Sequence, residues 1–138
     1  MKLDHLGLVV GDIQKYFDEF LMPVLGVKEL SGIYTDHNQL SKVAFVKTAN
    51  ECRIELIEPL NESSPVSQVL KKRKGSLHHM CFIADDFDKD VKRMQDNRCL
   101  MISPPMPAVA FDNRRVVFFF TPTYEVIEIV EEIKEDQL

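Results

Sequence analysis

The residues LDHLGLVVGDI at positions 3–13 are followed, 74 positions later, by the similar stretch LHHMCFIADDF at positions 77–87. This alignment places His5 on His79 and Asp12 on Asp86. A second pair of stretches, IELIE at 54–58 and IEIVE at 127–131, aligns at an offset of 73. Two well-separated stretches therefore share nearly one offset, which indicates two copies of one supersecondary unit.

Each copy contains the same expected order of elements: an alternating strand, a helix capped by an aspartate, and three further strands. The first copy is expected to have strands near 3–10, 27–34, 42–47 and 53–58, with a helix from Ile13 that Pro23 and Gly26 end. The second copy is expected to have strands near 77–84, 99–102, 115–120 and 125–131, with a helix over about 87–97. The sequence thus predicts an α+β fold in which two βαβββ modules form a curved mixed sheet with a concave face.

The length of 138 residues, with 45% apolar and 28% charged residues, fits a single globular domain. We expect one domain over 1–138, with module one over about 1–60 and module two over about 76–133. Between them, Ser64 and Pro65 have the pattern of a helix start, which predicts a linking helix over about 64–74 that Gly75 ends.

The net charge of −5 gives no electrostatic reason to bind nucleic acid or an anionic membrane. No stretch approaches 18 uninterrupted apolar residues, and the first residues do not read as a signal peptide. The three cysteines lack CxxC spacing, so we expect reduced thiols and a cytoplasmic protein.

Four polar residues stand at equivalent positions in the two copies: His5, Glu55, His79 and Glu128. Period-two alternation places them on the sheet face opposite the helix. An unpaired buried carboxylate is costly, whereas two imidazoles and two carboxylates suit a divalent cation such as Co, Ni, Zn, Mn or Fe. We therefore predict a metal site on the concave face. The ordinary alternative is that each histidine has a structural role and that the glutamates form a solvent-exposed row. We expect such an exposed row for Glu58, Glu131 and Glu132.

These stretches, together with EPL at 58–60, SP at 64–65 and LHH at 77–79, resemble the vicinal-oxygen-chelate superfamily. That superfamily includes glyoxalase I, extradiol dioxygenases, bleomycin-resistance proteins and methylmalonyl-CoA epimerase, and the chain is most similar to the epimerase branch. The resemblance implies a glyoxalase-like fold and metal ligands at His5, Glu55, His79 and Glu128. The chain departs from the epimerase pattern near Ser41, Lys42 and Val43, where some members have a glutamate proposed as the base.

The resemblance implies a metal-dependent isomerase or epimerase that removes a proton next to a carbonyl, with the metal as the Lewis acid that holds the enolate. Glu128 and Glu55 are the expected acid–base groups, and Lys42 is a weaker candidate at the position of the family's base. The implied substrate is an acyl-CoA, with Lys71–Lys74 or Arg114 and Arg115 as candidate contacts for its phosphates. Open strand edges favour a homodimer.

Three other functions stay open at this point. The same ligand set resembles that of glyoxalase I, a lactoylglutathione lyase. A ferrous extradiol dioxygenase would use His5, His79 and Glu128 as ligands, although the fourth candidate, Glu55, argues against it. A non-catalytic binding protein of the bleomycin-resistance type would hold its small molecule without metal.

Overall fold

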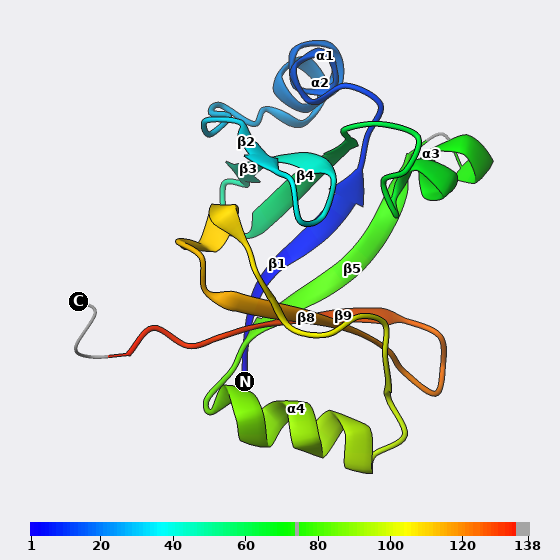
Figure 1. The fold of residues 1–138 in the computed structure, drawn as a ribbon. Coiled ribbons are helices and arrows are strands. Elements are labelled where there is room, and N and C mark those ends of the chain that lie inside the picture. The colour runs from blue at the N-terminus through cyan, green and yellow to red at the C-terminus, as the bar shows by residue number, and fades with distance from the viewer. Residues whose placement is uncertain (74, 135–138) are drawn as a thin grey trace. The chain divides into compact units, whose positions relative to one another are not determined.

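The computed structural model describes residues 1–73 and 75–134. They divide into two compact units, one of Met1–Asp4 with the chain from His79 onward, and one of His5–His78. In the sequence, the two division points fall within strands β1 (Lys2–Val9) and β5 (Ser76–Ile83), which Figure 1 labels. Each unit is described by itself below.

The unit of His5–His78 contains the first βαβββ module, and its strands lie in the order β2-β3-β4-β1. Strands β1 and β4 are parallel, and the other neighbours are antiparallel. After β1 come α1 (Ile13–Tyr16), the π-helical turn η1 (Phe17–Leu21), α2 (Met22–Leu25), β2 (Tyr34–Asp36), β3 (Ser41–Lys47), β4 (Arg53–Pro59) and α3 (Ser67–Arg73).

The helical segment of this unit continues beyond Pro23. The prediction named Pro23 and Gly26 as the residues that end it; helical structure passes Pro23, persists to Leu25 and stops at Gly26, whose φ of 69° is left-handed. Proline cannot donate a hydrogen bond and crowds the carbonyl four residues before it. In the π-helical turn just ahead of Pro23, the Met22 N–H donates to the Phe17 carbonyl five residues back. This wider turn relieves the crowding between the Pro23 ring and the preceding carbonyls.

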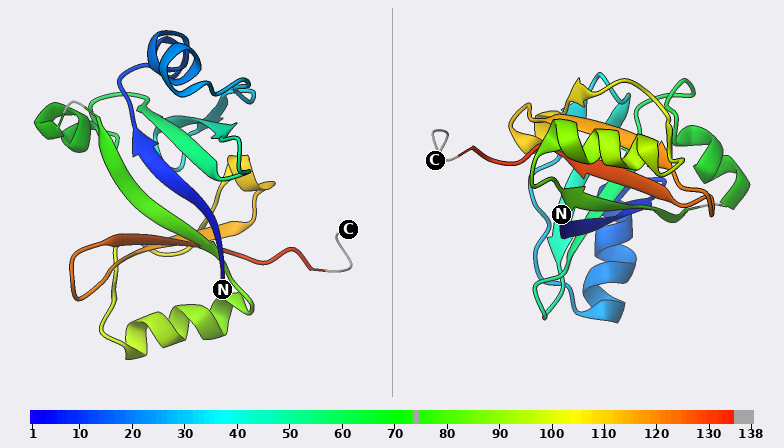
Figure 2. Two further views of the ribbon diagram at one scale, coloured as in Figure 1. Left: turned by 180° about the vertical axis from the view of Figure 1, so that it is seen from behind. Right: turned by 90° about the horizontal axis from the view of Figure 1, so that it is seen from below.

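The second unit contains the second module, in the strand order β5-β9-β8-β6, with β7 also paired to β8. Strand β5 runs parallel to β9, and β8 is antiparallel to its neighbours. Its elements after β5 are α4 (Phe87–Asp96), β6 (Leu100–Met101), β7 (Met106–Pro107), the 3-10 turn η2 (Val109–Phe111), β8 (Arg115–Phe120) and β9 (Val126–Val130). Helix α4 covers one face of β8 and β9 (Figure 2), where Phe87, Phe119 and Ile129 are fully buried.

The predicted α+β class with two βαβββ modules is confirmed, while several local predictions are wrong. The strand expected near 27–34 is limited to a single bridge at Leu30 and to β2, which begins at Tyr34. The elements β7 and η2 were not predicted. The linking helix is α3, which begins at Ser67; Lys74 lies outside the described residues. No helix in the described part of the chain is long and apolar enough to cross a membrane.

Both modules anchor their helix in the same way. Asp12 caps α1 by accepting from the Lys15 N–H at 2.8 Å, and the Ile13 N–H donates to Glu58 at 3.0 Å. In the second module, Asp86 accepts from the Lys89 N–H at 3.2 Å, and the Phe87 N–H donates to Glu132 at 3.1 Å. A carboxylate at a helix N-terminus also complements the helix dipole.

The expectation of a solvated row at Glu58, Glu131 and Glu132 is therefore wrong. Glu58 and Glu132 close the two helix starts, and Glu131 pairs with Arg115 at 2.8 Å. The hydrogen bond from the Arg115 guanidinium holds the pKa of Glu131 below its usual value. Arg115 also stacks on Phe87, 4.4 Å from the ring centroid, so it ties β8 and β9 to the start of α4.

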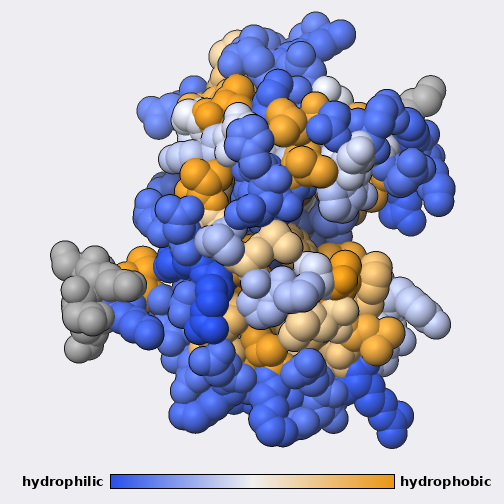
Figure 3. Space-filling view, viewed as in Figure 1, coloured by the Kyte–Doolittle hydropathy of each residue, from blue (hydrophilic) through white to orange (hydrophobic). Residues whose placement is uncertain are grey.

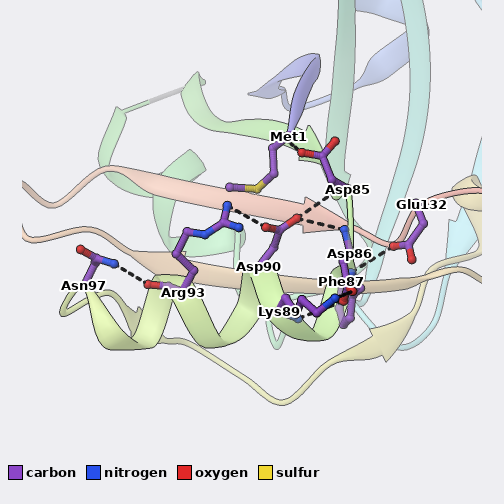
Figure 4. A network of polar contacts seen from close by, with 9 residues as sticks. All are labelled: Met1, Asp85, Asp86, Phe87, Lys89, Asp90, Arg93, Asn97 and Glu132. Carbon is purple, nitrogen blue, oxygen red and sulfur yellow. Dashed lines mark hydrogen bonds and ion pairs between the residues drawn. The ribbon is translucent and has the colours of Figure 1, made fainter.

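A buried aspartate organises the start of α4 (Figure 4). Asp90 is 1% exposed, and its Oδ2 accepts from the backbone N–H groups of Asp85 and Asp86 at 2.9 and 3.3 Å. Its Oδ1 lies 2.9 Å from Arg93, one turn further along the helix. The single carboxylate therefore satisfies two backbone donors of the tight connection between β5 and α4.

Replacing Asp90 with alanine should lower the free energy of unfolding by roughly 1–3 kcal/mol, because two backbone donors lose their acceptor in a buried place. Urea unfolding followed by circular dichroism measures this loss. Asp96→Ala is the matched control, since the Asp96 side chain is 60% exposed and pairs with Lys92 on the helix surface. Its loss should stay under about 0.5 kcal/mol. Equal effects of the two variants would contradict the role of Asp90.

Candidate metal centre

The first module buries a histidine and a glutamate together. His5 lies on β1 and Glu55 on the neighbouring strand β4, where Glu55 is in register with Gly7. The His5 Nε2 and the Glu55 Oε2 are 3.2 Å apart, and the two residues are 1% and 5% exposed. Because Gly7 has no side chain, nothing on β1 stands directly across from the carboxylate, and the imidazole two residues away reaches it.

The second module repeats this arrangement. His79 lies on β5 and Glu128 on β9, where Glu128 is in register with Cys81. The His79 Nε2 and the Glu128 Oε2 are 3.0 Å apart, and the two residues are 4% and 2% exposed. The same pair of residue types, at the same strand positions, is thus buried once in each unit.

An aromatic ring holds each histidine from the adjacent antiparallel strand. Phe45 on β3 is in register with Glu55 and packs edge-on against His5, with ring centroids 5.5 Å apart. Phe118 on β8 is in register with Glu128 and packs edge-on against His79, also at 5.5 Å. Edge-to-face packing fixes the plane of each imidazole.

These side chains occupy the sheet face opposite the helix, as alternation predicts. The neighbours of Glu55 along β4, Ile54 and Leu56, pack in the cluster that holds α1. The neighbours of Glu128 along β9, Ile127 and Ile129, pack in the cluster beneath α4. The helix-covered face is apolar in both units, so each His–Glu pair lies on the other side of its sheet.

The donor set of each unit fits a divalent cation. Two ligands about 2.1 Å from one ion and at right angles to each other have their donor atoms about 3 Å apart. The measured separations of 3.2 and 3.0 Å between imidazole nitrogen and carboxylate oxygen match this spacing. The burial of both pairs matches a coordinated group as well, because an isolated carboxylate is costly away from water.

Lys42, the weaker acid–base candidate, lies apart from these residues. On β3 it is in register with Glu58, three positions from the Glu55 register, so it lies on the opposite face from Val43 and Phe45. Its Nζ is 3.1 Å from Glu58, on the side of the sheet that α1 covers. We therefore leave Lys42 out of the site.

Sequence reasoning missed Phe45, although a signal for it existed. Phe45 and Phe118 are related by the same offset of 73 that relates Glu55 to Glu128. The structure places Phe118 against His79 as it places Phe45 against His5. Arg114 and Arg115, which were candidate phosphate contacts, already bind Glu131 and Asp88. Lys71 on α3, another candidate, is exposed and pairs with Glu62.

Two βαβββ modules, each with a buried His–Glu pair on the sheet face opposite its helix, define the class of glyoxalase-like proteins. The comparison with known families agrees with this geometry. The model of the glyoxalase/bleomycin resistance protein/dioxygenase superfamily matches residues 4–118, and the chain belongs to that superfamily.

Individual relatives come from both uncharacterised and characterised proteins. The chain is 32% identical to the uncharacterized protein YqjC of Bacillus subtilis over 117 residues, covering 85% of this chain and 81% of that protein. It is 30% identical to the mitochondrial methylmalonyl-CoA epimerase of Bos taurus over 103 residues, or 74% of this chain, but spans only 57% of that protein's length. The methylmalonyl-CoA epimerase structure from Mycobacterium tuberculosis superposes with a TM-score of 0.81 over 97% of this chain and 89% of that one. At 24% identity this last match concerns the fold alone.

The placement of Lys42 on the helix side leads to a direct test. Lys42→Met should leave the affinity of the chain for Co²⁺ within about twofold of the unchanged protein, because the removed ammonium is on the other face of the sheet. Titration with Co²⁺, followed by its visible absorption, measures the affinity. Glu55→Met is the comparison variant and should weaken it strongly. A tenfold loss for Lys42→Met would contradict the assignment of faces.

Proposed function

We propose that His5, Glu55, His79 and Glu128 together hold one divalent cation. Three observations support this proposal: the equivalence of the two His–Glu pairs, their burial, and the donor spacing of 3.2 and 3.0 Å within each. Two imidazoles and two carboxylates would satisfy four positions of an octahedral ion and neutralise its charge. Two positions would remain for oxygens of a substrate.

We propose further that the chain is a metal-dependent epimerase that acts on an acyl-CoA, in the manner that its similarity to methylmalonyl-CoA epimerases suggests. The observation that carries this proposal is the presence of two buried carboxylates, one in each module. Epimerisation next to a carbonyl needs a base on one side of the carbon and an acid on the other. Membership of the superfamily is compatible with both an enzyme and a binding protein, and the two buried carboxylates favour the enzyme.

The chemistry assigned to these residues is a proton transfer. A carboxylate oxygen of Glu128 or Glu55 takes the proton from the carbon next to the thioester carbonyl. The C–H electron pair moves onto the carbonyl oxygen as an enolate. The other glutamate enters the step as the protonated acid, free of the cation, and gives its proton to the opposite face of the carbon; the two groups then exchange protons with solvent. A divalent cation held by the site would supply Lewis-acid stabilisation of negative charge on oxygen. The phenylalanine rings beside His5 and His79 keep the imidazoles in place and exclude water.

The metal is tested first. Protein purified without chelator or histidine tag should contain about one divalent ion per chain by mass spectrometry, and His79→Ala should lose it. Added metal at 100 times its dissociation constant should stabilise the protein by about 2.7 kcal/mol, which raises its melting temperature. His78→Ala is the matched control, because His78 neighbours His79 on β5 with the opposite alternation.

The outcome that contradicts the metal proposal is equally specific. If neither the unchanged protein nor protein reconstituted with Co, Ni, Zn, Mn or Fe retains an ion, the four residues do not form a metal site. Retention of the ion by His79→Ala would likewise remove His79 from it.

Turnover is tested by exchange of the proton next to the carbonyl with solvent deuterium. Metal-loaded protein should exchange this proton of methylmalonyl-CoA, and Glu128→Gln should lower the rate at least about a hundredfold, because an amide is a poor base. Mass spectrometry of the recovered thioester measures the exchange. Glu62→Gln, an exposed surface change, is the control. Conversion of the methylglyoxal–glutathione hemithioacetal without any exchange of the thioester would support glyoxalase I-type chemistry instead.

A further inference from the structure

The turn that joins β8 to β9 holds a tyrosine in a backbone conformation that favours glycine. Phe120 and Val126 are the last paired residues of the two strands. Beyond them, the Thr121 N–H donates to the Glu125 carbonyl at 3.0 Å, and the Tyr124 N–H donates to the Thr121 carbonyl at 3.0 Å. Tyr124 has a φ of 69°, a position of this kind of hairpin loop where glycine is usual and a bulky side chain is strained.

Burial in the core does not offset this strain. The Tyr124 side chain is 87% exposed, so its ring contributes little packing to its own chain. Strained residues that the fold itself does not require are concentrated at binding and active sites. The conformation of Tyr124 therefore points to a contact with a bound molecule.

Hydrogen bonds fix the shape of this turn. The hydroxyls of Thr121 and Thr123 both donate to the Glu125 carboxylate, and the Glu125 N–H donates to the Thr121 hydroxyl at 3.1 Å. The hydrogen bond from the Thr121 hydroxyl, followed by that from Thr123, lowers the pKa of Glu125. A turn held in this way keeps the backbone of Tyr124 in place, which reduces the entropy lost when its ring makes a contact.

The two strands lead from this turn to the candidate metal ligand Glu128 of the same unit. Residues two apart along a strand point to the same side and are about 7 Å apart. Phe120 therefore follows Phe118 on one face of β8. Val126 precedes Glu128 on the same face, which is that of the His79–Glu128 pair. A molecule that reaches from Glu128 to the turn has to extend past Val126, so it must be longer than about 7 Å.

The surface between Glu128 and the turn is apolar and partly open. Leu100 on β6 is in register with Phe120, and the two are 70% and 42% exposed. The residues that alternate with them, Met101 and Phe119, pack under α4, so the exposed pair is not part of that core. Figure 3 shows apolar side chains gathered around β8. An apolar chain laid along this surface would remove these side chains from water.

We infer that Tyr124 is a specificity-determining residue whose ring packs against an elongated, largely apolar part of the substrate, with Phe120 and Leu100 as the rest of that contact surface. This inference rests on the proposed function, because it concerns the molecule bound at the same site. It deepens that function by naming the residue that selects for an extended chain next to the thioester. Two chains have this chemistry: the pantetheine arm of the carrier and a long acyl branch.

The test measures the binding of three thioesters by isothermal titration calorimetry, with cobalt-loaded and with metal-free protein. Methylmalonyl-CoA has the full carrier arm. Methylmalonyl-N-acetylcysteamine has a truncated arm, and butylmalonyl-N-acetylcysteamine has a truncated arm with a longer acyl branch. The variants are Tyr124→Gly, which removes both the ring and the strain, and Tyr124→Phe, which keeps the ring.

Arg98→Gly is the matched control. Arg98 is exposed, has a φ of 66°, and follows α4 with its N–H donated to the Gln95 carbonyl at 3.1 Å. Glycine relieves left-handed strain at both positions, so Arg98→Gly and Tyr124→Gly should have melting temperatures at or above that of the unchanged protein. A loss of affinity in Tyr124→Gly is then separated from any loss of stability.

Tyr124→Gly should weaken the binding of methylmalonyl-CoA or of butylmalonyl-N-acetylcysteamine about tenfold, whereas Tyr124→Phe and Arg98→Gly should stay within about twofold. A loss confined to the CoA ester identifies the pantetheine arm, and a loss confined to the longer branch identifies the acyl group. Methylmalonyl-N-acetylcysteamine has neither chain, so its affinity should not change. An equal loss for this short thioester, or an equal loss in Tyr124→Phe, would overturn the inference.

The remaining outcomes separate this inference from the proposed function. Deuterium exchange in methylmalonyl-CoA, with affinities that Tyr124→Gly leaves unchanged, would overturn the inference and leave the epimerase intact. Affinities that depend on Tyr124 without any exchange would support the elongated ligand and remove the epimerase. If light scattering shows that Tyr124→Gly converts a dimer to a monomer while the affinities stay the same, the turn is an interface between two copies and the inference is wrong. If none of the three thioesters binds either form of the protein, both are overturned.

Discussion

The burial of a carboxylate in the middle of a strand, beside a histidine on the next strand, is the constraint on which each half of this protein depends. Glu55 and Glu128 are 5% and 2% exposed, and a carboxylate hidden from water is tolerated only with a charged, hydrogen-bonding or metal partner. In their own units, the His5 and His79 Nε2 atoms lie 3.2 and 3.0 Å from these carboxylates, a spacing that suits two ligands of one cation. A slip of one residue in strand register would turn each glutamate into the apolar layer beneath the helix. The register, the faces and the helix position of each module therefore follow from the same pair.

The larger features of the chain were predictable because they depend on periodicity and repetition. The offset between His5 and His79 indicated two modules, and alternation placed Glu55 and Glu128 on the face opposite the helix. The predictions of local structure fail where contacts between residues distant in sequence determine the conformation. The π-helical turn ahead of Pro23 is a response of the helix to one residue. The strand expected near 27–34 keeps only the bridge of Leu30 to Val46 before β2, and there the Phe45 N–H donates to the Ser31 hydroxyl. Lys42 was misplaced because its face relative to Glu55 depends on the register between β3 and β4, which no single strand reveals.

The roles of Glu58 and Glu132 were likewise not predictable from the local sequence. Glu58 lies near the end of β4 and Glu132 just after β9, positions typical of a solvated surface. The structure instead brings each to the first N–H of a helix 45 residues earlier in the chain. Only the repetition of both contacts in the two modules distinguishes this from chance. The boundaries of the modules as folding domains, the four-residue metal set, the homodimer and the cytoplasmic location remain predictions that the fold alone does not test.

These two helix anchors also bear on how the chain reaches its native state. Each joins the last strand of a module to its first helix, so the loop that must close is about one third of the chain. Closure entropy grows with loop length, and folding slows as contacts become more distant in sequence. Since both partners of each His–Glu pair belong to the same module, a half-site can be assembled by the same closure that anchors the helix. A nascent chain emerging from the ribosome would then have the residues for one complete half before the second half is synthesised.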